Sequence, residues 1–174
     1  MTSILINIFS IIALGIIQVS FLTTWPKPVS SLNIILSLII FFAIILNYKK
    51  SLWYAFGAGL FIELFSGYAF GITTLALILT VVIVNWLFNN FFTNRSFYSL
   101  MILGFIATIV YNLLITITLF SLALAGRNII GFEFSFFTQY FWQPFFNLIV
   151  LAIIFITYYF STGRLKNIFL FPTH

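Results

Sequence analysis

The chain has 174 residues, of which 63% are hydrophobic and only 5% are charged. Its mean hydropathy is +1.23, and a soluble domain could not cover its surface with so few charges, so the composition predicts a polytopic membrane protein. The seven Lys and Arg are scattered, which excludes a nucleic-acid-binding surface and favours topology signals and contacts with the lipid bilayer. The sequence contains no cysteine, which excludes disulfides and thiolate metal sites.

Taken in chain order, the apolar runs predict one all-α domain over residues 1–174, a bundle of six transmembrane helices. The expected spans are 4–22, 32–47, 51–69, 72–92, 98–124 and 141–160. We interpret the first as a retained helix, because it lacks the basic leader and cleavage site of a signal peptide. The long run 51–92 is expected to fold as a tight hairpin near Phe70, in preference to a re-entrant pair. All four prolines are expected in connections, tails or the first turn of a span, the last applying to Pro144.

The distribution of basic residues predicts that both termini are cytoplasmic. With six spans, one side of the membrane carries five basic residues and the other carries two. The first group is Lys49, Lys50, Arg95, Arg164 and Lys166, and the second is Lys27 and Arg127. The longest outer connection, 126–140, is rich in Ile and Phe, so we expect it to lie in the headgroup region or to be covered by a partner.

Glu63 is one of only two acidic residues and is surrounded by apolar sequence. An ionisable group at membrane depth costs about 3 kcal/mol by insertion scales, so it needs an explanation. Glu63 shares a helix face with Ala55, Gly59 and Gly67, a spacing that lets helices approach closely. Two interpretations remain open: a contact for a ligand, proton or partner, or an uncharged structural carboxyl bonded to a tyrosine or to one of two buried amides. These amides are Asn85 and Asn112.

The remaining polar residues predict no catalytic, cofactor or metal site. There is no Asp, and the only histidine is the last residue, so neither a nucleophile–base pair nor a metal-ligand cluster can be assembled. The sequence therefore predicts a protein that is not an enzyme. Five buried amides are expected mainly to specify the fold through interhelical hydrogen bonds, although a polar ligand cavity is also compatible with them. They are Gln18, Asn33, Asn85, Asn112 and Asn147.

Residues 57–76, G-A-G-L-F-I-E-L-F-S-G-Y-A-F-G-I-T-T-L-A, resemble the motif of the rod-shape-determining protein MreD family, G-x-x-x-G-L-x-x-D-x-x-S-G-x-x-x-G-x-x-x-L. The matching positions are Gly59, Leu60, Ser66, Gly67, Gly71 and Leu75. Glu63 stands where the family usually has Asp, and Pro28 is not followed by the acidic residue that is common there. The resemblance implies helix-packing or partner contacts at Gly59, Glu63, Gly67 and Gly71.

The resemblance also implies a non-enzymatic subunit of the cell-elongation complex in a bacterial inner membrane. Its partner would be an MreC-like single-span protein, with RodA and a class B penicillin-binding protein, which make peptidoglycan, as indirect partners. The alternative is the substrate-binding S component of an energy-coupling-factor vitamin transporter, which is similar in length and helix number. Such proteins usually carry A-x-x-x-A in the first helix, whereas here Ala13 is followed four residues later by Ile17.

Overall fold

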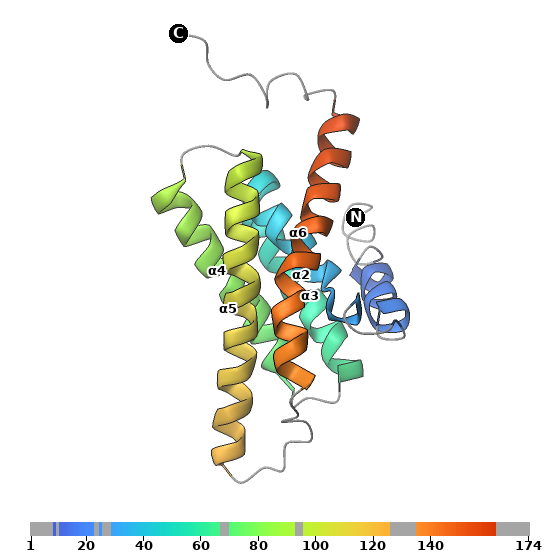
Figure 1. Ribbon diagram of the computed structural model, residues 1–174, viewed down its shortest axis with the longest axis vertical. Coiled ribbons are helices and arrows are strands. Elements are labelled where there is room, and N and C mark those ends of the chain that lie inside the picture. The colour runs from blue at the N-terminus through green and yellow to red at the C-terminus, as the bar shows by residue number, and fades with distance from the viewer. Residues whose placement is uncertain are drawn as a thin grey trace.

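A computed structural model of the chain describes residues 9, 11–22, 25, 29–66, 70–92, 96–125 and 135–162. Every regular element in these ranges is helical (Figure 1). The four long helices are α3 (Tyr48–Ser66), α4 (Ile72–Phe91), α5 (Phe97–Leu124) and α6 (Ser135–Ser161). They run alternately down and up in Figure 1, so each packs antiparallel to the next along the chain. Long apolar runs favour this arrangement because a helix satisfies its own backbone hydrogen bonds.

The centre of the bundle is a short helix. α2 (Ile34–Phe41) continues into the π-helical η3 (Phe42–Leu46), and α2 contacts α3, α4, α5 and α6. Most of its side chains are buried, which is typical of a helix that packs on all sides. The Ser51 hydroxyl of α3 donates to the carbonyl oxygen of Ile39 at 2.8 Å, which joins α2 to its neighbour.

The N-terminal helical segment Ile11–Ser20, whose end overlaps the π-helical η1 (Ile17–Leu22), lies beside this core. It is followed by the short 3-10 helix η2 (Val29–Ser31). The segment packs against α3, because Gly15 faces the ring of Phe61 and Ile11 reaches Gly57. A side chain at position 15 would collide with that ring, so glycine permits the close approach.

The structure differs from the expectations at the second span, which is shorter, and at Pro144, which lies inside a helix. Among the described residues, three helices are long and apolar enough to cross a membrane, namely α4, α5 and Tyr140–Ser161 of α6. The second expected span is shorter, because the helix over Ile34–Leu46 reaches only about 20 Å at 1.5 Å per residue. The expectation for Pro144 is wrong: α6 begins at Ser135, so this proline lies inside the helix.

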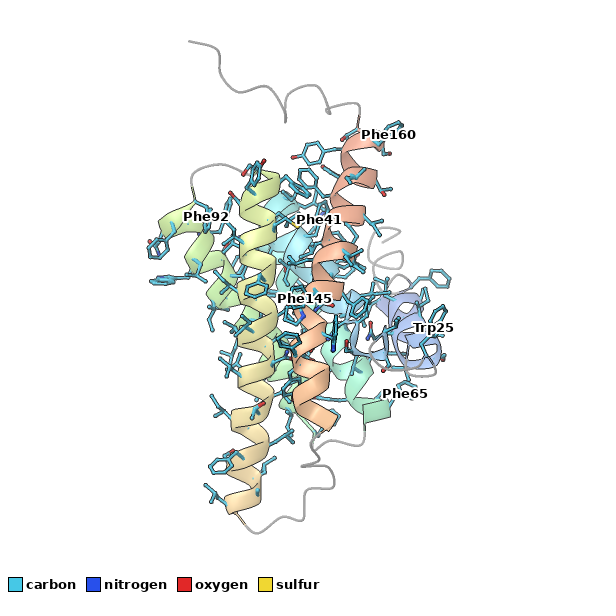
Figure 2. The ribbon with its side chains drawn as sticks, viewed as in Figure 1. Trp25, Phe41, Phe65, Phe92, Phe145 and Phe160 are labelled. Carbon is cyan, nitrogen blue, oxygen red and sulfur yellow. The ribbon has the colours of Figure 1, made fainter. Side chains whose placement is uncertain are left out.

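Aromatic side chains cover much of the outside of the bundle, and Figure 2 shows Phe160 and Trp25 projecting from it. Phe41, by contrast, is buried and its ring stacks edge-on against Tyr158. Several sequence features lie outside the described residues, including most of the outer connection. These are Gly67, Lys27, Arg95, Arg127, residues 126–134, Arg164 and Lys166.

Candidate functional site

The helix starts show why Glu63 matters. α2, α3 and α5 each begin beside a polar residue whose side chain accepts a hydrogen bond from a backbone N–H of the first turn. These residues are Asn33, Asn47 and Ser96. α4 begins after Gly71, which has no side chain to serve in this way. Its first turn therefore needs an acceptor from elsewhere.

Glu63 supplies that acceptor from the opposite helix of the hairpin. The residue is only 5% exposed, and both of its carboxyl oxygens accept hydrogen bonds from Thr74. The Thr74 backbone N–H donates to Oε1 and the Thr74 hydroxyl to Oε2, each at 2.9 Å. Thr74 is the third residue of α4, so its N–H has no partner within the helix. Glu63 is thus the N-terminal cap of α4, which explains a carboxyl group in an apolar setting.

Gly59 and Gly71 make this contact geometrically possible in two different ways. A Cβ atom on Gly59 would lie 2.7 Å from the Cα of Thr74, so only glycine lets the two backbones approach this closely. Gly71 has a φ of 99°, a left-handed conformation that residues with a side chain rarely adopt. A Cβ there would meet nothing within 4 Å, so Gly71 serves the turn rather than a helix-packing contact.

The sequence analysis did not name Thr74 as a partner of Glu63. Of the two amides named there, Asn85 is half-buried, and Oδ1 of Asn112 has no hydrogen-bond partner within the described part of the chain. Thr74 was missed because a threonine in an apolar helix carries no distinctive pattern. The signal was positional, since a hairpin that turns near Phe70 brings Thr74 opposite Glu63.

A second polar cluster surrounds the start of α2. Gln18 bridges the break before this helix, because its Nε2 donates to the Leu32 carbonyl and its Oε1 accepts from the Ile34 N–H, both at 2.9 Å. Asn147 of α6 is fully buried, and its Oδ1 accepts from the Asn33 N–H at 2.9 Å. Three of the five amides expected to specify the fold therefore hold one helix start in place.

Chemically, the two clusters can position helices. Their carboxyl and amide groups bind donors and acceptors of neighbouring elements, and such bonds fix helix register. Among the described residues, no three His, Cys, Asp or Glu side chains come together as a metal site. The fold and these clusters define a bundle of apolar helices in which buried polar side chains hydrogen-bond to the starts of neighbouring helices.

Comparison of the chain with protein-family models, with curated proteins and with solved structures gives no match.

Proposed function

We propose that this chain is a multi-pass inner-membrane subunit of the bacterial cell-elongation complex. In this proposal it spans the bilayer six times with both termini in the cytoplasm. It holds the transmembrane helix of an MreC-like partner and catalyses no reaction. RodA and a class B penicillin-binding protein are then reached through that partner.

The observation that carries the proposal is the arrangement of residues 57–76. The described parts of the run that resembles the MreD family, residues 57–66 and 70–76, lie at the end of α3 and the start of α4, and three of its distinctive residues have separate tasks there. Gly59 permits the close approach, Glu63 caps α4, and Gly71 makes the turn. A motif that makes a hairpin rigid fits a scaffold, because a scaffold must present its outer surface in a fixed shape.

The hairpin contact also limits where a partner helix can bind. Around Gly59 the face of α3 is occupied by α4 of the same chain, so a partner must use an outer face instead. Large apolar side chains are exposed on α4, α5 and α6, for example Val82, Leu113 and Ile153. Exposed apolar area of this kind suits lipid or another transmembrane helix.

Depletion of the protein in a rod-shaped host, followed by affinity capture, tests the proposal. We expect the cells to become round and an MreC-like single-span protein to be captured. Normal cell shape, with capture of two ATPase subunits and a bound vitamin, would instead support the transporter alternative.

Crosslinking can locate the partner, because the natural sequence contains no cysteine. Single cysteines at positions 82, 113 and 153 place one reactive group on each of three helices. We expect one of these faces to crosslink to the partner strongly while the other two serve as matched controls. Equal weak labelling at all three positions would count against a defined helix-binding face.

A further inference from the structure

The interface between α5 and α6, which lie side by side in Figure 1, contains a polar seam. On α5 a stripe of small and polar residues recurs every four positions: Gly104, Thr108, Asn112 and Thr116. Gly104 faces Leu151, and the Thr108 hydroxyl accepts a hydrogen bond from Asn147 Nδ2 at 3.3 Å. The side chain of Thr116 hydrogen-bonds with that of Tyr140. The seam is therefore paired both above and below Asn112.

The same register places Gln143 opposite Asn112. Each step of four residues forward on α5 corresponds to four residues back on α6, as the pairs 104 with 151 and 108 with 147 show. The next pair is 112 with 143. Both side chains are buried, with exposed fractions of 7% for Asn112 and 6% for Gln143. The register therefore predicts that the two amides lie at one level of this interface.

Asn112 differs from the other buried amides of the bundle. Oδ1 of Asn112 has no hydrogen-bond partner among the described residues, whereas Oδ1 of Asn33 and of Asn147 each accept a backbone N–H. An acceptor buried without a donor costs about 1–3 kcal/mol. Native proteins usually avoid that cost with an ordered water or a ligand.

We propose that Asn112 and Gln143 form a binding site, between α5 and α6, for a small uncharged molecule that donates a hydrogen bond to Asn112 Oδ1. The donor is an O–H or N–H group, supplied by a water molecule or by a small polar solute. The guest is uncharged because the neighbouring seam consists of amides and hydroxyls, and a charge buried there would lack a counter-ion. This site is separate from Glu63 and does not depend on the proposed cellular role.

Thermal unfolding of the purified full chain in lipid nanodiscs tests the proposal with Asn112→Leu. If a guest occupies the site, removing its acceptor lowers the unfolding temperature by several degrees. If the site is empty, the same variant removes an unpaired polar atom, so an unchanged or higher unfolding temperature overturns the proposal. Thr80→Val is the matched control, because the buried Thr80 hydroxyl bonds within its own helix to Ala76, and its loss is expected to have little effect.

A second measurement on the unmodified protein covers the case in which Asn112→Leu does not fold. Radiolytic labelling in heavy-oxygen water modifies side chains next to a bound water, and native mass spectrometry detects a bound solute. Labelling of the segments around Asn112 and Gln143 identifies water as the guest, whereas a small-molecule adduct identifies a solute. If the measurement finds no labelling of these segments and no adduct, the proposal is overturned.

Discussion

The Glu63–Thr74 contact and the amide cluster at the start of α2 both provide acceptors for backbone N–H groups at a helix start. They differ in how far apart the bonded residues lie in the sequence. Glu63 reaches Thr74 across a tight hairpin, only eleven residues away. Asn147 reaches Asn33 across 114 residues and therefore joins the two ends of the fold. The comparison teaches that a local contact shapes one hairpin, whereas a long-range contact decides where the central helix begins.

The largest effect is expected from the hairpin. Gly59→Ala places a Cβ atom 2.7 Å from the Cα of Thr74, and backbone cannot move aside as a side chain can. We expect a loss of about 2–3 kcal/mol in the free energy of unfolding, because overpacking separates Glu63 from Thr74. Chemical unfolding in nanodiscs measures this loss.

Gly57→Ala is the control, because its Cβ would lie 3.1 Å from the flexible end of Ile11. Equal losses in the two variants would show that close approach to Thr74 is not special.

The amide cluster should respond next. Asn147→Leu leaves the Asn33 N–H without its acceptor, so we expect a loss of about 2 kcal/mol in the same unfolding measurement. Thr108→Val removes the longer contact at the other end of this amide, at 3.3 Å, together with a hydroxyl bond to the Gly104 carbonyl within the same helix, and should cost less because it leaves no backbone N–H without an acceptor. A larger effect from Thr108→Val would mean that Asn147 acts mainly on α5 rather than on the start of α2.

The smallest effect is expected at the turn. Gly71→Ala introduces no clash but must adopt a φ of 99°, so we expect a loss of about 1 kcal/mol. Gly71→Asn should recover part of it, because asparagine tolerates the left-handed region better. Unfolding curves that do not distinguish the three proteins would show that the turn conformation contributes nothing to the hairpin.

Sequence reasoning predicted the local features of the fold. Alternation of apolar runs with short breaks predicted an all-helical chain, and the break near Phe70 predicted the position of the turn between α3 and α4. The small residues near Glu63 pointed to close helix packing, which the contact of Gly59 with Thr74 provides. These features depend on residues that are near one another in sequence.

Sequence reasoning did not predict the features that depend on contacts between residues far apart in the chain. The start of α2 after Asn33 depends on Gln18 and Asn147, and no local pattern names these partners. Pro144 was expected at a helix start because proline usually disrupts a helix interior, yet α6 continues through it within a packed interface. Thr74 and Asn112 are both buried polar residues of apolar helices. Thr74 is hydrogen-bonded to Glu63, whereas Oδ1 of Asn112 has no partner among the described residues, and only the three-dimensional structure separates the two cases.

The most direct test of the account compares Glu63→Gln with Glu63→Leu by thermal unfolding in nanodiscs. Glutamine can accept from the Thr74 N–H and donate to its hydroxyl, so we expect it to stay close to the unmodified protein. Leucine offers no acceptor, so the N–H at the start of α4 loses its partner and the unfolding temperature should fall by several degrees. An unchanged unfolding temperature for Glu63→Leu, or an equal fall for both variants, would contradict the role of Glu63 as the cap of α4.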